Sequence, residues 1–282
     1  MNNTSESARD TLKRLETRAN KALGQNFLVD TQILQDIESL IQEHVQPTFV
    51  EVGPGLGALT EILAATGKRV VAIEKDQLLA EELKRALSEK GIQNVEVHIG
   101  DARTFDFSTI EGPYTFVSNL PFNAGTFILR SAVEHAHPPE SSIVIMQKEV
   151  VERIAVNDGK WSLLSLAIQL ETTATRVRTI SKRAYHPKPA VDTALLLLEK
   201  RDTPLISLEG EEKADFFRLL KWAFAGKRKQ LSNTLASGLH VPTARAKEVL
   251  QQASIEPSIR AERLQLSDWE RLFRTLQKEQ LI

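Results

Sequence analysis

The chain has 282 residues, with 36 Lys and Arg against 37 Asp and Glu, and it contains no cysteine. This length predicts about two domains, and the composition, 41% hydrophobic, is typical of a globular protein. The lack of cysteine excludes a disulfide scaffold, a thiolate nucleophile and cysteine-based zinc sites. No apolar run approaches a membrane span. The start of the chain mixes acids with basic residues and lacks an apolar h-region, so it does not resemble a secretory or mitochondrial signal. We therefore expect a cytoplasmic protein.

The predicted elements begin after a polar stretch, residues 1–20, which we interpret as a flexible tail or a loose helix. Residues 33–41 then show the apolar spacing of an amphipathic helix, and from residue 48 strand-like and helix-like segments alternate. The predicted strands are Thr48–Val52, Arg69–Ile73, Val95–Ile99, Tyr114–Val117 and Ser142–Met146, and the predicted helices begin near Ala58, Gln77, Thr126 and Lys148. This alternation predicts an α/β fold with a mostly parallel, Rossmann-like sheet covered by helices on both faces.

The second half of the chain changes pattern. Residues 176–180 and 193–198 read as two strands without an intervening helix, which favours an antiparallel addition to one edge of the sheet. Residues 201–210 resemble a linker, and the pattern from residue 211 onward is helical. We therefore predict one domain over residues 21–202 and a small all-α domain over residues 211–282.

A glycine-rich loop follows the first strand of the predicted sheet, with Gly53, Gly55 and Gly57 in a G-x-G-x-G pattern. Glycines at this place let backbone N–H groups approach a ligand at a helix N-terminus, although a tight strand–helix turn alone would also explain them. Glu74 ends the second strand and Asp101 follows the third. An acid at the first position can accept from ribose hydroxyls, and one at the second can accept from an adenine amino group. Without a pyrophosphate to hold, the pattern fits S-adenosylmethionine.

The fourth predicted strand ends in Asn119-Leu120-Pro121-Phe122. This motif suits methyl transfer to the exocyclic amine of a planar base. The Asn119 side-chain carbonyl can accept one N–H, the backbone carbonyl before or at the proline can accept the other, and Phe122 can stack on the base. Catalysis would then depend on positioning and electrostatics rather than on a strong base. The target base has to be single-stranded, in a loop, or flipped out of a stack.

Together with later blocks, these motifs resemble the small-subunit ribosomal RNA adenine N6,N6-dimethyltransferases, also called dimethyladenosine transferases. The resemblance covers about residues 21–280, and its further markers are the blocks at residues 23–30, 146–154, 187–193, 225–235 and 260–264. It implies a class I methyltransferase sheet. It also implies S-adenosylmethionine-dependent N6,N6-dimethylation of two adjacent adenosines in a hairpin loop near the 3′ end of 16S rRNA, on the small ribosomal subunit or its assembly intermediate.

The resemblance also implies roles for individual residues. Asn119, Leu120, Pro121 and Phe122 would hold the target adenine, and Gln25 with Asn26 would cover the cofactor as an N-terminal lid. Together with the glycine loop, the implied cofactor contacts are Asn26, Leu28, Gly53, Gly55, Glu74, Asp101 and Asn119.

A net charge of −1 does not exclude a local basic face. Basic residues are concentrated in residues 176–201 and 218–229. Given the methyltransferase motifs, we interpret these stretches as contacts to rRNA phosphates. The predicted RNA-binding residues are Arg183, Lys188, Lys227, Arg228 and Lys229. The histidines show no metal-ligand spacing, so we expect no metal, and we expect a monomer.

Three alternatives remain beside this interpretation. A methyltransferase that modifies an adenine of 23S rRNA and confers macrolide resistance has a similar acceptor motif, although residues 225–235 and 260–264 favour the small-subunit enzyme. A ribosome assembly factor with weak or lost methylation would keep the binding role alone. A dinucleotide oxidoreductase is disfavoured by the glycine spacing and by the Asn-Leu-Pro-Phe motif.

Overall fold

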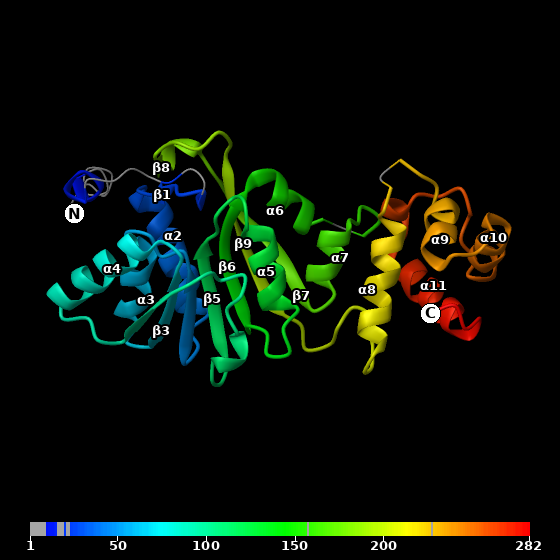
Figure 1. Cartoon of the computed structure of the whole chain (residues 1–282), viewed down its shortest axis with the longest axis horizontal. Helices are drawn as coiled ribbons and strands as arrows, with labels where there is room; N and C mark the ends of the chain where they lie inside the picture. The colour runs from blue at the N-terminus through cyan, green and yellow to red at the C-terminus, as the bar shows by residue number, and fades with distance from the viewer. Residues whose placement is uncertain (1–9, 16–19, 21–22, 157, 227) are drawn as a thin grey trace. The chain divides into compact units, whose positions relative to one another are not determined.

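The computed structural model describes residues 10–15, 20, 23–156, 158–226 and 228–282. The chain divides into two compact units, which Figure 1 shows in the colours of the chain order. The first unit holds residues 1–152 and 173–200, and the second holds residues 153–172 and 201–282.

A mixed sheet forms the centre of the first unit. Among the described residues it has seven strands in the order β4-β3-β2-β5-β6-β9-β7. Their bounds are β2 Thr48–Val52, β3 Arg69–Glu74, β4 Val95–Ile99, β5 Tyr114–Asn119, β6 Ser141–Gln147, β7 Thr172–Ile180 and β9 Thr193–Lys200. Strands β2 to β6 pair in parallel, whereas β9 pairs antiparallel with β6. The predicted α/β class with antiparallel strands at one edge is confirmed.

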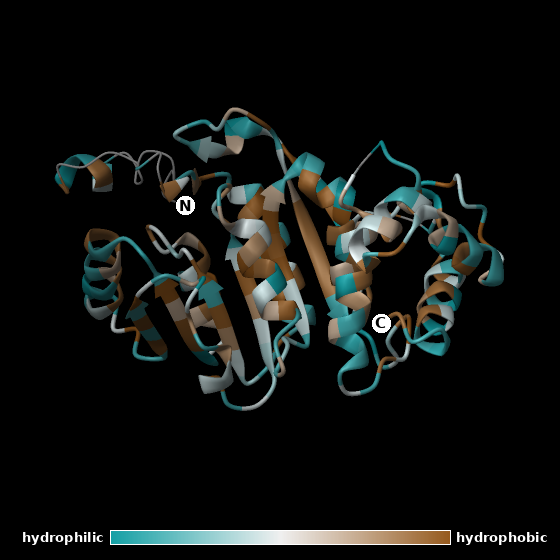
Figure 2. Cartoon of the chain, turned by 45° about the vertical axis from the view of Figure 1, so that its right-hand side comes forward, coloured by the Kyte–Doolittle hydropathy of each residue, from teal (hydrophilic) through white to brown (hydrophobic). Residues whose placement is uncertain are grey.

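Both faces of the sheet are covered, which explains the near-continuous apolar character of its central strands. Every residue of β2 is buried. Figure 2 shows these central strands mostly in the hydrophobic colour. On one face, Phe49, Val117 and Ile143 join a core cluster with side chains of α2 and α3. The alternate residues of the same strands, such as Val50 and Val144, are equally buried on the opposite face.

The parallel strands of the first unit are connected by α3 Ala58–Ala65, α4 Gln77–Glu89 and α5 Gly125–Val133. Helix α2, Thr31–Glu43, precedes β2, and α6, Lys148–Ile154, follows β6. Local sequence explains where two of these helices begin, because the side chains of Asp30 and Asp76 accept the first free N–H groups of α2 and α4. A short two-stranded sheet, β1 (Phe27–Leu28) against β8 (Tyr185–His186), was not predicted.

The second unit is helical. Its helices are α7 Leu163–Gln169, α8 Glu212–Ala223, α9 Leu231–Leu239, α10 Thr243–Gln252 and α11 Leu266–Lys278. Its core places Trp161 and Leu166 with Phe216, Leu235 and Trp269. Residues 153–172, which we expected within the first domain, therefore belong with the C-terminal helices because their apolar side chains are buried in this core.

One further expectation differs from the structure, and for part of residues 1–20 the structure selects the helix among the two alternatives. Residues 201–210 are not a bare linker, since Ile206 is buried in the core of the second unit and Arg201 donates to the carbonyls of Gln169 and Thr172. Most of residues 1–20 lie outside the described residues, but residues 10–14 are helical. Leu12 packs with Phe27 and with Leu79 of α4, so this part of the predicted tail is a docked helix.

Candidate active site

The main cavity of the first unit opens at the carboxyl ends of the parallel strands. It has a volume of about 700 Å³ and is lined by residues that follow β2, β3, β4 and β5 and by the segment before β1. The chain proceeds from β2 outward to β3 and β4, and then continues with β5 on the other side of β2. Open α/β sheets bind their ligands at such a reversal of strand order. The volume of the cavity also lies in the range of small-molecule sites.

The glycine loop lies between β2 and α3 and adopts conformations that other residues avoid. Gly53, Gly55 and Gly57 all have positive φ angles, of 68°, 57° and 86°. A side chain built at Gly53 would meet no protein atom within 4 Å, so the space beside its backbone belongs to the cavity. The Gly55 N–H donates to Oε2 of Glu74 at 3.0 Å, which ties the loop to the end of β3. This open, glycine-lined space is the kind of cradle in which backbone can approach a bound cofactor.

Two carboxylates lie beneath this loop. Glu74 also accepts the Asp76 N–H at 2.9 Å, so both of its oxygens hold backbone groups in place beside the cavity. Burial raises the pKa of Glu74, against the lowering effect of its backbone hydrogen bonds. Glu51 is more deeply buried and accepts the Thr60 hydroxyl at 2.7 Å. The pKa of Glu51 is raised to about 8, because burial and, to a lesser extent, the negative charge of Glu74 outweigh the lowering effect of the Thr60 hydrogen bond.

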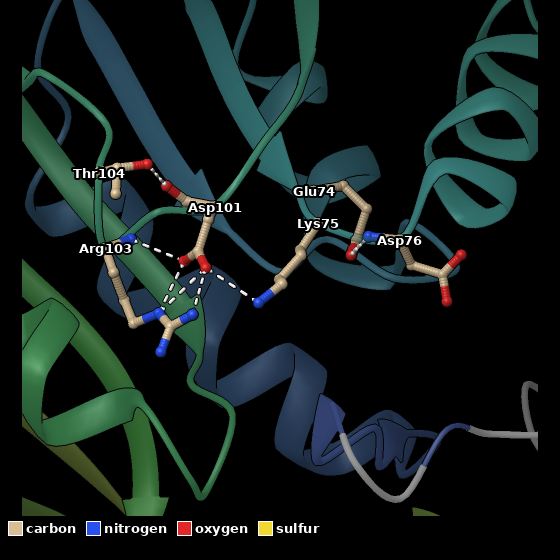
Figure 3. A network of polar contacts seen from close by, with 6 residues as sticks. All are labelled: Glu74, Lys75, Asp76, Asp101, Arg103 and Thr104. Carbon is tan, nitrogen blue, oxygen red and sulfur yellow. Dashed lines mark hydrogen bonds and ion pairs between the residues drawn. The ribbon is translucent and has the colours of Figure 1, made fainter.

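The carboxylate of Asp101 forms ion pairs with two basic side chains in the structure. Arg103 donates from Nε to both carboxylate oxygens at 3.0 Å, and Lys75 Nζ donates to Oδ2 at 2.9 Å (Figure 3). These partners, led by Arg103, hold the pKa of Asp101 well below its usual range. All three residues line the cavity. Asp101 thus lies where the sequence placed it, but an acceptor role toward a ligand requires it to share its oxygens with these cations.

The acceptor motif begins at the last residue of β5 and continues into the turn before α5. The Asn119 amide donates from Nδ2 to the Asn26 carbonyl at 2.9 Å. Since that carbonyl can only accept, the network assigns Oδ1 as the free end of the Asn119 amide. The Pro121 carbonyl accepts the N–H groups of Ala124 and Gly125 at 3.2 and 2.7 Å. Of the two backbone acceptors that the sequence left open, the turn therefore favours the carbonyl before the proline, that of Leu120.

The segment before β1 crosses from the acceptor motif to α4. Gly24 packs against the acceptor turn, because a Cβ there would lie 3.3 Å from the Phe122 nitrogen. The Gln25 side chain donates to Asp76 at 2.8 Å, and Asn26 Nδ2 donates to the Gly24 carbonyl at 3.0 Å. The predicted lid residues thus contact both ends of the cavity and also line it.

The docked N-terminal helix, residues 10–14, extends this cover. Arg14 pairs with Glu82 of α4, and Thr11 lines the cavity. Together with Arg85, Arg14 lowers the pKa of Glu82 to about 2. Neither Thr11 nor Leu12 was singled out from the sequence.

The predicted RNA-binding residues divide between the two units. Arg183 and Lys188 are exposed in the first unit and Arg228 and Lys229 in the second, whereas Lys227 lies outside the described residues. Within the described part of the chain, none of these four cations has an acidic partner at ion-pair distance. By contrast, Arg218 pairs with Asp215 at 2.5 Å. The described residues contain no cluster of potential metal ligands. None of their helices has the length and apolar character of a membrane span.

Sequence reasoning missed several residues that shape the cavity. Lys75 and Arg103 escaped notice because their proximity to Asp101 depends on the pairing of neighbouring strand ends. The burial of Glu51 also escaped notice, although its place between Val50 and Val52 in a predicted strand was a visible signal.

Comparisons with known proteins identify rRNA methyltransferases as relatives of this chain. The family model described as "Ribosomal RNA adenine dimethylase" matches residues 16–278. Among curated relatives, "Ribosomal RNA small subunit methyltransferase A" of Myxococcus xanthus is 36% identical, covering 96% of this chain and 95% of its own. The protein of that name from Streptococcus equi subsp. zooepidemicus is 38% identical, covering 89% and 90%.

Solved structures share the fold. The 23S rRNA methyltransferase ErmE is 27% identical with a TM-score of 0.68, covering 89% of this chain and 100% of its own. A dimethyladenosine transferase from Plasmodium falciparum is 22% identical with a TM-score of 0.75, covering 89% and 97%.

Proposed function

The chain belongs to the ribosomal RNA adenine dimethylase family and is an S-adenosylmethionine-dependent rRNA adenine dimethyltransferase, and we propose a specific substrate and set of residue roles for it. The substrate is two adjacent adenosines in a hairpin loop near the 3′ end of 16S rRNA, within the small ribosomal subunit or its assembly intermediate. The small-subunit name of the curated relatives supports this choice. The enzyme acts as a monomer in the cytoplasm, where it meets these subunits.

The orientation of the Asn119 amide is the observation that carries the proposal. Because Nδ2 is held by the Asn26 carbonyl, Oδ1 is available to accept one N–H of the adenine N6 amine. The Leu120 carbonyl accepts the other N–H, and Phe122 stacks on the base. Two acceptors in the plane of the amine leave its lone pair directed out of that plane. This arrangement aims the nucleophile, which is the main catalytic contribution expected of a site without a strong base.

S-adenosylmethionine supplies an electrophilic methyl group when it is bound. The N6 lone pair would form the new bond to the methyl carbon as the carbon–sulfur bond breaks, so that S-adenosylhomocysteine leaves with the electron pair. The extra proton on the nitrogen would then pass to water. Residues 119–124, which surround the amine in this proposal, include no titratable side chain. They position the amine and do not deprotonate it.

The cofactor is held at the carboxyl ends of β2 to β5. Glu74 accepts the ribose hydroxyls with the lone pairs that its two backbone hydrogen bonds leave, and Asp101 accepts from the adenine amino group. Leu28, which is buried and lines the cavity, packs against the cofactor. The full set of proposed cofactor contacts is Asn26, Leu28, Gly53, Gly55, Glu74, Asp101 and Asn119.

The exposed cations bind rRNA phosphates. Arg183, Lys188, Arg228 and Lys229 have no acidic partner among the described residues, so their charge is available to a phosphate. We assign Lys227 to the same group on its sequence position alone.

Methyl transfer from labelled S-adenosylmethionine to unmethylated small subunits tests the proposal, with the modified adenosines mapped afterwards. Wild-type protein is expected to add methyl groups to two adjacent adenosines. Asn119→Ala should lower kcat by about 100-fold or more, the loss typical of one preorganised hydrogen bond in a transition state. Replacing both Arg228 and Lys229 with Ala should weaken the binding of small subunits and reduce the salt dependence of that binding. Arg218→Ala is the matched control, because Arg218 is already paired with Asp215.

Other outcomes would overturn parts of this assignment. Transfer to 23S rRNA alone would favour the resistance-type methyltransferase. Binding to small subunits without transfer would favour an assembly factor that has lost the chemistry. Full activity of Asn119→Ala would contradict the role given to its amide.

A further inference from the structure

A second hollow adjoins the active-site cavity on the outer side of α5. It has a volume of about 410 Å³ and shares Phe122, Asn123 and Ala124 with the main cavity. We call it the outer hollow, and its lining residues are Phe122, Asn123, Ala124, Thr126, Phe127, Arg130, Ser131 and Glu134. The acceptor turn is therefore the wall between the two spaces.

The outer hollow is built by one face of α5. Positions 126, 127, 130 and 131, together with the C-cap residue 134, follow the spacing of neighbours along a single helix face. The opposite face packs Ile128, Leu129 and Val133 into the core. Phe127 thus points away from the core although it is large and apolar, and its 55% exposure exceeds that of the other large hydrophobic residues exposed in the described part of the chain. Packing within this unit does not explain an aromatic ring at this position.

The charge of the outer hollow is balanced. Arg130 Nε donates to Glu134 Oε1 at 2.7 Å, and both side chains are partly exposed. A phosphate would meet no net positive charge here, because the carboxylate offsets the guanidinium. A nucleobase would meet the face of Phe127 together with hydrogen-bond donors and acceptors from Arg130, Ser131 and Glu134. The chemistry of the hollow therefore favours a base over a phosphate.

We propose that the outer hollow binds the base next to the target adenosine in the same RNA strand, with Phe127 as its stacking surface. This inference rests on the proposed function, in which a single-stranded adenosine enters the main cavity at Phe122. Its covalent neighbour is then held close to the acceptor turn, and the outer hollow is the space on the other side of that turn. Stacking on an aromatic side chain is sequence-tolerant, so the hollow can receive either neighbour of the two target adenosines.

Steady-state methyl transfer to unmethylated small subunits tests this assignment with three variants. Phe127→Ala is expected to raise KM for subunits by about 5- to 150-fold, the range that corresponds to the ~1–3 kcal/mol of one stacked base, with little change in kcat. Phe127→Tyr keeps the ring and should restore the KM of the wild type. Leu78→Ala, which trims an apolar side chain that is also exposed but belongs to α4, should behave as wild type. The Kd for S-adenosylmethionine should be the same in all four proteins.

Each contrary result has a distinct meaning. An unchanged KM in Phe127→Ala, with the wild type active, would overturn the base-binding role of the outer hollow and leave the proposed function standing. Equal losses in Phe127→Ala and Phe127→Tyr would overturn stacking as the cause. A wild-type protein without transfer to small subunits would overturn the proposed function itself, and this inference with it.

Discussion

Replacing Glu51 with Gln should remove a pH-dependent cost that burial of this carboxyl imposes on the first unit. The side chain is 1% exposed, and burial raises its pKa from 4.5 to about 8. Folding therefore takes up a proton between these values, so the penalty is absent below pH 4.5 and grows until pH 8. Each pH unit in this window lowers the unfolding free energy by about 1.4 kcal/mol. Glutamine keeps the shape and the acceptor for Thr60 but does not titrate.

The expected result is a difference between the two proteins that grows with pH. From about pH 5.5 to about pH 7.5, Glu51→Gln should gain about 2.5 kcal/mol of unfolding free energy relative to the wild type. Hydrogen exchange of the β2 and β3 amides, which belong to the first unit, measures this difference. Comparing the two proteins at the same pH cancels the pH dependence of intrinsic exchange.

Glu111→Gln is the matched control, because it makes the same chemical change at an exposed residue of the same unit. Its difference from the wild type at each pH is the baseline with which the Glu51→Gln difference is compared. A Glu51→Gln difference that does not grow with pH relative to this baseline would refute the reasoning, since it would mean that Glu51 ionises in the folded protein much as it does in the unfolded chain.

Two further changes probe the cavity, and a third probes the docked helix of residues 10–14. Glu74→Gln should raise the Kd for S-adenosylmethionine by about 10- to 150-fold, because a hydrogen bond to a charged group contributes about 1.5–3 kcal/mol; calorimetry that finds the same Kd would remove Glu74 from the cofactor site. Arg103→Ala should lower that Kd by up to about five-fold, since it releases Asp101 from an exposed ion pair worth ~0.2–1 kcal/mol, whereas a higher Kd would make Arg103 itself a cofactor ligand. Leu12→Ala should reduce hydrogen-exchange protection of residues 10–15 by at least about 10-fold, because it truncates the side chain buried against Phe27; unchanged protection would mean that this contact does not hold the helix.

Much of the first unit was predictable because its signals are local. The strands Thr48–Val52 and Val95–Ile99 have the predicted bounds, since each is a short β-rich run closed by turn residues. By contrast, α7, Leu163–Gln169, was missed because it is short and nearly all buried, which leaves no polar stripe to reveal a helical period. The docking of residues 10–14 was also beyond the sequence, because it depends on the face that α4 presents.

The sequence predicts where the site residues lie in the fold, but it does not predict which hydrogen bonds and ion pairs they form. The strand order brings Glu74, Asp101 and Asn119 to one edge of the sheet, as parallel pairing requires. Whether Asp101 is free or paired depends on the rotamers of Lys75 and Arg103, which no spacing rule determines. The direction of the Asn119 amide likewise depends on a carbonyl 93 residues earlier in the chain.

The division of the chain has a consequence for the order in which the protein forms during synthesis. Residues 153–172 belong to the second unit, whereas residues 173–200, which follow them, belong to the first unit and include its strands β7 and β9. Trp161, Leu166 and Leu170 emerge from the ribosome before β7 and β9, yet the helices that bury them begin only at residue 212. These three apolar side chains therefore stay without their core until most of the C-terminal helices have been translated. A fragment that ends at Lys200 would have a complete sheet and still expose them, so the two units cannot be separated by a single cut.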